Sequence, residues 1–275
     1  MKLKQYIKEN NEELTVRTNY RQLNFNECID LIKQSYNVAF NNKHYIYRGI
    51  ENNIDCIYVN PKLVTRRSAY ASENYYTELL DSFKSWQDYP KRSKSLICTN
   101  SLDKVNEYTW NGNQYIVLPH NNANLAIAPN NDIWYSFKLL KNINVKNLSN
   151  LNSKILLILN YILDYLDDLD DLDDIVIILK KVTKKFLNDY DLKHVINNKL
   201  TNQYLITLFK ESNYHSLYDY LEHLMDPKLN EFKLIDIKQF DSFNGINNEI
   251  WTSDECILIK ETYYHLIKDK INNEV

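Results

Sequence analysis

Near the end of the chain stands the stretch Asn247-Asn248-Glu249-Ile250-Trp251-Thr252-Ser253-Asp254-Glu255-Cys256-Ile257-Leu258-Ile259-Lys260. Its four consecutive apolar residues, from Cys256 to Ile259, predict a short buried strand. Glu255 directly precedes this strand. A carboxylate at the border of an apolar strand loses hydration, so its charge is available to act on a bound ligand. The alternative is an ordinary hydrated turn residue.

The length and composition are those of a folded globular protein. The chain has 275 residues, of which 44% are hydrophobic and 25% charged, enough to bury a sizeable core. The net charge of −3 and the pI of about 6.1 give no overall attraction to nucleic acid or to an acidic membrane. Asn, Lys, Ile and Tyr are abundant, as expected of an AT-rich genome, so only the positions of residues are informative.

The four cysteines lack the CxxC spacing of metal sites and redox motifs; they are Cys28, Cys56, Cys98 and Cys256. We expect buried free thiols rather than disulfides or zinc ligands. The first residues lack the apolar run of a signal peptide, and no stretch has the length of a membrane span. These features predict a cytoplasmic protein, in its own cell or in a host.

The first half of the chain predicts helices followed by strands. Apolar residues recur every three or four positions from Phe25 to Phe40, which predicts a helical lobe over residues 1–42. Strands are then expected at His44–Ile50, Cys56–Val59 and Leu96–Cys98, with a helix over 66–88 between the last two. The basic cluster Lys91-Arg92-Ser93-Lys94-Ser95 either binds phosphate or nucleic acid or is a solvated turn.

The second half predicts more strands, interrupted by a helical segment. A helix is expected over 102–108, a hairpin of 114–118 with 125–128, a further strand over 132–137, a strand over 232–237 and a final helix over 263–271. Helical spacing dominates residues 150–230, which we interpret as an insertion. The predicted fold is therefore α+β, a single domain with a split mixed or antiparallel β core formed by residues 43–140 and 232–275.

No metal site is expected. His194, His215 and His223 show no i, i+4 pairing. The acidic run from Asp164 to Asp174 lacks the Gly and Glu of a calcium-binding loop, so it is interpreted as a solvated helix face.

Three motifs in this order resemble the ADP-ribosyltransferase superfamily, in the class built on an arginine, a Ser-Thr-Ser motif and a late glutamate. Tyr47-Arg48-Gly49 resembles the first motif, Cys98-Thr99-Asn100-Ser101-Leu102-Asp103 resembles the second, and Trp251 to Ile259 resembles the third. The chain's three glycines, Gly49, Gly112 and Gly245, each stand near one motif. Residues 89–134 also resemble phage-encoded proteins of unassigned function.

The resemblance implies that NAD is the substrate and that ADP-ribose is transferred to an acceptor. Glu255 would stabilise the oxocarbenium-like ribose, because a nearby carboxylate offsets positive charge in the transition state. Arg48 would bind the pyrophosphate, and Gly49 would contact the nicotinamide amide. The other implied contacts are those of Thr99 with Glu255, of Asn100 and Ser101 in the turn, and of Tyr47, Tyr45 or Trp251 with the nicotinamide ring.

One position departs from the family pattern. Members that modify arginine carry a second glutamate two residues before the catalytic one, and here that position is Ser253. The hydroxyl leaves other acceptors open, namely another side chain, a nucleic-acid base, a small molecule or water.

Two alternatives remain. The first is a non-enzymatic interaction protein with a degenerate transferase fold, which binds a partner through the 150–230 helices. The second is a nucleic-acid-processing protein that uses Lys91, Arg92 and Lys94, although the sequence lacks the clustered acids of a two-metal nuclease.

Overall fold

The computed structural model describes residues 20–50, 53–63, 75–108, 113–163, 175–189 and 203–273. The chain forms two compact units. The helical unit contains the described residues of 75–87 and 133–230, and the sheet unit contains those of 20–63, 88–132 and 231–273. Within these described ranges, no helix combines the length and the apolarity that crossing a bilayer requires.

The sheet unit is built on nine strands in the order β1-β3-β9-β5-β2-β4-β8-β6-β7, and every neighbouring pair is antiparallel. The strands are β1 Tyr20–Gln22, β2 Ile46–Ile50, β3 Cys56–Val59, β4 Leu96–Thr99, β5 Asn113–Pro119, β6 Asn124–Ile127, β7 Lys233–Asp236, β8 Glu249–Thr252 and β9 Cys256–Lys260. The predicted α+β class is confirmed, and of the two sheet types that the prediction left open, mixed or antiparallel, the sheet is antiparallel.

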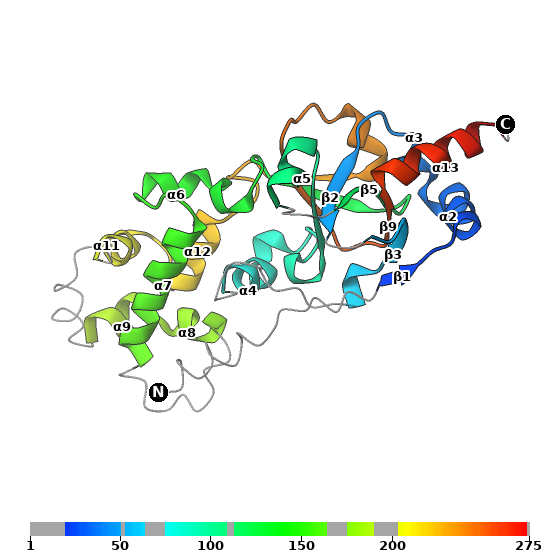
Figure 1. The fold of residues 1–275 in the computed structure, drawn as a ribbon. Coiled ribbons are helices and arrows are strands. Elements are labelled where there is room, and N and C mark those ends of the chain that lie inside the picture. Colours follow the sequence, from blue (N-terminus) through cyan, green and yellow to red (C-terminus); the bar gives the residue numbers. More distant parts are fainter. Residues whose placement is uncertain are drawn as a thin grey trace. The chain divides into compact units, whose positions relative to one another are not determined.

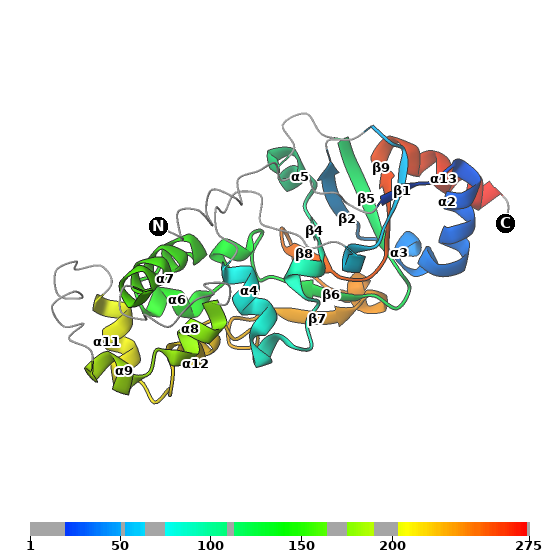
Figure 2. The same cartoon turned by 90° about the horizontal axis from the view of Figure 1, so that it is seen from below.

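The sheet divides into two halves between β2 and β4, which share the single residue pair Tyr47 and Thr99. The connection from β8 to β9 requires a bend. In a flat sheet four strand intervals would separate β8 from β9, about 19 Å, whereas the chain from Thr252 to Cys256 spans at most about 14 Å. The two halves must therefore fold toward each other, and in Figure 2 β6 and β7 run across the direction of β2 and β5.

Helices from both ends of the chain cover one face of the β9 and β5 half (Figure 1). They are α2 Phe25–Leu31, the π-helical turn η1 Ile32–Tyr36, α3 Asn37–Asn41 and α13 Glu261–Asn273. Asn24 caps α2 through a capping box with Glu27, which satisfies first-turn N–H groups. The Tyr264 hydroxyl of α13 donates to the Phe40 carbonyl at 3.1 Å. The two terminal segments thus form one apolar layer.

The sheet unit also contains short helical elements in its loops. They are η2 Pro61–Leu63, η4 Arg92–Lys94, α5 Leu102–Tyr108 and η6 Ile237–Ser242.

A disulfide between Cys28 of α2 and Cys56 of β3 joins this helical layer to the sheet. The expectation of four free thiols is therefore wrong for this pair, because packing of α2 on β3 brings together two cysteines that the sequence separates by 28 positions. The thiols of Cys98 and Cys256 remain reduced and buried. Disulfides persist mainly in oxidising compartments, so this bond does not itself support a cytoplasmic localisation.

The helical unit consists of α4 Tyr75–Ser82, η3 Lys84–Trp86, η5 Ile133–Tyr135, α6 Lys138–Asn142, α7 Leu148–Leu163, α8 Ile175–Lys181, α9 Lys184–Asp189, α11 Gln203–Glu211 and α12 Leu217–Leu224. Ser216 begins α12 with a capping box, and the Trp86 indole donates to the Met225 carbonyl at 2.8 Å. The acidic run 164–174 and His194 lie outside the described residues.

Two predicted strand features are wrong. Residues 114–118 and 125–128 form no hairpin, because β5 pairs with β2 and β9 whereas β6 pairs with β7 and β8. Residues 132–137 contain the 3₁₀ turn η5 instead of a strand. The strand expected at 232–237 and the helices expected at 102–108 and 263–271 are confirmed as β7, α5 and α13.

Candidate functional site

Glu255 lies in the turn between β8 and β9, where its carboxylate is hydrogen-bonded on the side covered by η1. The Asn60 amide donates to Glu255 Oε1 at 3.1 Å, and the Tyr58 hydroxyl also bonds this carboxylate. Burial, followed by this bond and the charge of Glu255, raises the pKa of Tyr58 to about 12. Burial, and then the same charge, raises the pKa of Tyr36. The carboxylate of Glu255 is therefore already hydrogen-bonded to other side chains of the protein.

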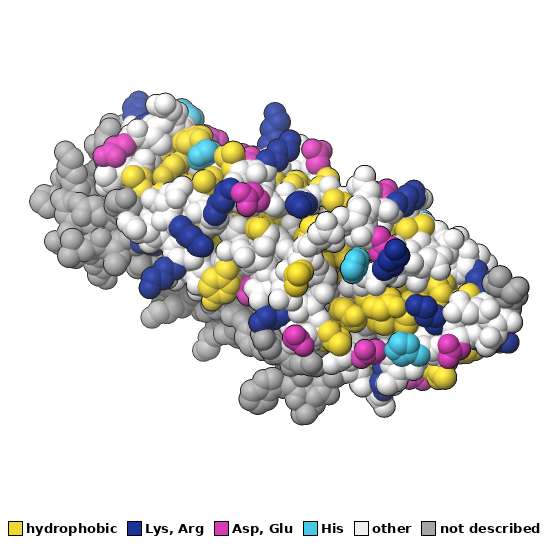
Figure 3. Space-filling view, turned by 90° about the horizontal axis from the view of Figure 1, so that it is seen from above, with side chains coloured by type: hydrophobic (Ala, Val, Ile, Leu, Met, Phe, Trp, Pro, Cys, Tyr) yellow, Lys and Arg dark blue, Asp and Glu magenta, His cyan; other side chains and the backbone are white. Residues whose placement is uncertain are grey.

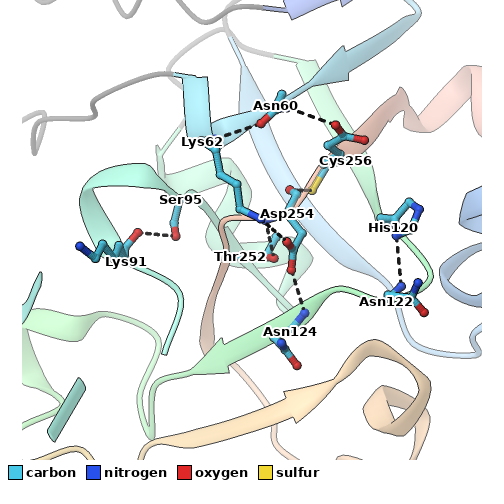
Figure 4. Close-up of polar contacts among 11 residues, drawn as sticks. Asn60, Lys62, Lys91, Ser95, His120, Asn122, Asn124, Thr252, Asp254 and Cys256 are labelled. Carbon is cyan, nitrogen blue, oxygen red and sulfur yellow. Dashed lines mark hydrogen bonds and ion pairs between the residues drawn. The ribbon is translucent and has the colours of Figure 1, made fainter. Parts of the chain in front are cut away.

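The rest of this turn is fixed from both sides (Figure 4). Lys62 Nζ lies 2.8 Å from Asp254 Oδ1, and the backbone N–H of Asn124 donates to Asp254 Oδ2 at 3.0 Å. The backbone N–H of Asp254 donates to Thr252 Oγ1 at 3.1 Å. Ser253, the predicted second catalytic position, is half-buried in this turn.

Arg48 points into the sheet unit from β2. Its Nη1 donates to the Ile97 carbonyl, and burial lowers the pKa of its guanidinium, an effect that the nearby thiols of Cys98 and Cys256 partly oppose. No carboxylate of the described residues forms an ion pair with it. Gly49, the next residue, has an ordinary strand conformation without a positive φ.

The structure does not bring Glu255 together with Arg48. Arg48 pairs with Tyr115, which pairs with Lys260. Glu255 precedes Lys260 by five positions, and side chains alternate between faces along a strand, so the two side chains leave the sheet on opposite faces. The bond of Glu255 to Tyr58 is consistent with this, since Tyr58 pairs with Ile257 and shares its face.

A different glutamate lies beside the Thr-Asn-Ser motif. Thr99 is the partner of Tyr47 in β2 and of Glu249 in β8. Directly paired residues of antiparallel strands point to the same face, so Tyr47, Thr99 and Glu249 form a row across three neighbouring strands.

The polar groups of the Thr-Asn-Ser motif bind the loop that precedes Glu249. Thr99 Oγ1 donates to the Asn248 carbonyl at 3.0 Å and accepts from the Ser101 N–H at 3.1 Å. The side chain of Asn100 accepts from the Asn248 N–H at 2.6 Å and donates to the Gly245 carbonyl at 2.8 Å. The motif therefore fixes the position at which β8 begins.

Glu249 forms a buried ion pair with Arg92. Arg92 Nη1 lies 2.7 Å from Glu249 Oε1, and the two side chains are 6% and 12% exposed. The Arg92 guanidinium also lies over the Trp251 ring, 5.1 Å from its centroid. Arg92 therefore does not belong to a surface basic cluster. Over the described residues of the face in Figure 3, basic, acidic and apolar side chains are intermixed without a continuous basic surface.

The three candidates for stacking on nicotinamide all contact protein groups. Trp251 is buried against Arg92 and Phe232. Tyr45 packs edge-on against Tyr264, with ring centroids 5.5 Å apart. Tyr47 is half-buried, and burial followed by the charge of Glu261 raises its pKa.

Sequence reasoning missed Glu249, which pairs with Thr99, and Arg92, which forms an ion pair with Glu249. A signal for Glu249 was present, since it too directly precedes apolar residues, Ile250 and Trp251. Nothing in the sequence pointed to its pairing with Arg92, which the fold alone brings about.

Comparison with protein-family models, with curated proteins and with solved structures found no match. In the described parts of the chain, no group of three or more His, Cys, Asp and Glu side chains is placed to hold a metal ion.

Proposed function

We propose that this chain is an NAD-dependent mono-ADP-ribosyltransferase of viral or toxin type, with a split β core of the ADP-ribosyltransferase kind, acting in the cytoplasm of its own cell or a host. The observation that carries the proposal is the row of Tyr47, Thr99 and Glu249 across neighbouring strands. Tyr47 belongs to the motif of Arg48 and Thr99 to the Thr-Asn-Ser motif, and both lie in line with Glu249, a glutamate late in the chain. In this form of the proposal the glutamate is Glu249 rather than Glu255.

The chemistry suits a carboxylate held in this way. Cleavage of the nicotinamide–ribose bond develops positive charge on the ribose, which a fixed carboxylate stabilises in a site of low dielectric. The hydrogen bonds of Thr99 and Asn100 to residue 248 hold the backbone beside Glu249. Preorganisation of this kind avoids a reorganisation cost during the reaction.

Arg48 is the proposed contact for the pyrophosphate. Its guanidinium has no carboxylate partner among the described residues, and a desolvated guanidinium favours a bidentate anion. Because Arg48 and Tyr47 are successive residues of β2, their side chains leave opposite faces, so this assignment needs its own test. Arg48→Lys is expected to raise the KM for NAD, and an unchanged KM would remove Arg48 from the site.

The experiment compares nicotinamide release and transfer of labelled ADP-ribose by the wild type, Glu249→Gln and Glu255→Gln. The two variants are a matched pair, because each removes one negative charge at the beginning of an apolar strand, at the first residue of β8 or directly before β9. Glu249→Gln is expected to lower the rate by at least about 100-fold, whereas Glu255→Gln keeps most of it. The proposal fails if wild-type protein, supplied with cell extract as a source of acceptors, neither binds nor consumes NAD.

One observation favours a second function, that of a non-enzymatic interaction protein. Glu249 is 12% exposed and paired with Arg92, and the Thr99 hydroxyl is hydrogen-bonded to the backbone of residues 101 and 248. The same contacts are expected of a network that only stabilises the fold. In that case the helical unit would bind a partner protein, and Ile177 of α8 is an apolar side chain exposed there (48%). Absence of NAD binding, together with a complex lost in Ile177→Asp, would support this function.

A further inference from the structure

We infer that Arg92 is a positioning residue, which orients the carboxylate of Glu249 toward the substrate and keeps a positive charge beside it. The inference rests on the proposed function and extends it to a residue outside the three motifs. Its basis is the contact of Arg92 with both Glu249 and Trp251 in the sheet unit.

Arg92 is held on a rigid turn. The Trp251 indole N–H donates to the Pro90 carbonyl at 2.9 Å, so the residue that stacks on the guanidinium also anchors the chain just before it. The Ser95 hydroxyl donates to the Lys91 carbonyl at 2.7 Å, and the Lys94 N–H donates to the same carbonyl at 3.0 Å. These bonds close the turn around η4.

The backbone of Glu249 is fixed independently of Arg92. Its N–H donates to the Asn130 carbonyl at 2.9 Å, and its carbonyl accepts from the Ala128 N–H at 2.9 Å. The register with Thr99 fixes its place in the sheet. Removal of Arg92 should therefore disturb the orientation and charge of the carboxylate more than the course of β8.

Charge is the property that Arg92 contributes. Two neutral residues flank Glu249 on its face of the sheet, namely Thr99 opposite it in β4 and Trp251 two positions along β8. The guanidinium comes from η4. Burial of a carboxylate without a positive neighbour disfavours its charged form, and only a charged carboxylate stabilises a cationic ribose.

The test uses Arg92→Met, which removes the charge at similar length, and Arg92→Lys, which keeps it. Arg92→Met is expected to lower kcat by about 100-fold with little change in KM, and to move the acid limb of the kcat/KM profile to higher pH. Arg92→Lys should recover at least about tenfold of the lost kcat, because it keeps the positive charge beside the carboxylate, although it loses the planar contact with Trp251. Equal kcat values and equal pH profiles in the two variants would overturn the inference.

The experiments distinguish a failure of the proposed function from a failure of the role assigned to Arg92. A wild type that does not consume NAD defeats the proposed function before any variant is made. An active wild type whose kcat is unaffected by Arg92→Met defeats only the role of Arg92. If Arg92→Met does not fold, Trp251→Phe removes the anchor to Pro90 while keeping a ring, and it is expected to move the acid limb in the same direction. A lower stability of Trp251→Phe with unchanged kcat and pH profile would contradict positioning.

Discussion

The contrast between two ion pairs of the sheet unit gives a quantitative prediction. Arg92 with Glu249 and Lys62 with Asp254 have nearly the same N to O distances, 2.7 and 2.8 Å. Their burial differs, since the first pair is 6% and 12% exposed and the second is 59% and 26% exposed. The N to O distances alone predict equal coupling energies for the two ion pairs, whereas the difference in burial predicts that the coupling energy of the Arg92 pair is much larger.

The magnitudes follow from solvation. Removing one partner of a buried pair leaves an uncompensated charge, which costs about 3–5 kcal/mol, and for Arg92→Met the lost stacking on Trp251 adds up to about 1–2 kcal/mol. An exposed pair contributes about 0.2–1 kcal/mol. A double-mutant cycle with Arg92→Met and Glu249→Gln should therefore give a coupling energy above about 2 kcal/mol. The control cycle with Lys62→Met and Asp254→Asn should give less than about 1 kcal/mol.

The assay is hydrogen exchange of the strand amides in the presence of urea. It reports the free energy of opening for the sheet unit alone, which matters because a chain with two compact units need not unfold in a single step. Coupling energies for the two pairs that agree within about 0.5 kcal/mol would refute the argument that burial makes the Arg92 pair strong.

Three further predictions concern the stability of the sheet unit. Gly245→Ala should cost about 1–3 kcal/mol, because the new methyl group would meet the ring of Phe243, and Phe243→Ala in the same chain should reduce this cost in urea unfolding. The pKa of Tyr58 is raised from 10.0 to about 12, so the stability that its neutral hydroxyl contributes is complete below pH 10.0 and is lost as pH rises through about 12. If the free energy of unfolding of Tyr58→Phe depends on pH in this window as that of the wild type does, the prediction is wrong. Reduction of the Cys28–Cys56 disulfide, which spans 28 positions, should lower the free energy of unfolding by roughly 3–4 kcal/mol, and a reductant should have no such effect on Cys28→Ser.

Local patterns in the sequence were sufficient for most strands. The apolar runs that became β5 and β9 are uninterrupted, and their residues are buried on both faces. A run of this kind has few alternatives to a central strand. The helices expected over 102–108 and 263–271 are likewise present as α5 and α13.

Strand pairing could not be predicted in the same way. The short connection of residues 120–123 between β5 and β6 favoured a hairpin, yet β5 lies in one half of the sheet and β6 in the other. The bend between the halves depends on contacts among β2, β4 and β8, which are far apart in sequence. Alternation of apolar and polar residues defines the faces of a strand but not its neighbours.

The candidate site shows the same limit. Glu249 and Glu255 have the same local pattern, a glutamate followed by apolar residues that form a strand. Only the register of β4 with β8 distinguishes them, because it places Glu249 opposite Thr99. The pair with Arg92 depends in addition on the turn at η4, which the sequence suggested only as a basic cluster.

Hydrogen exchange with and without NAD tests the central claim most directly, since it locates the ligand without requiring an acceptor. The account predicts slower exchange at β2, at β4 and at the start of β8, around Tyr47, Thr99 and Glu249, with no change near Tyr58 and Glu255. Protection confined to Tyr58, Asn60 and Glu255 would contradict the assignment of Glu249, and no protection at any strand would contradict NAD binding itself.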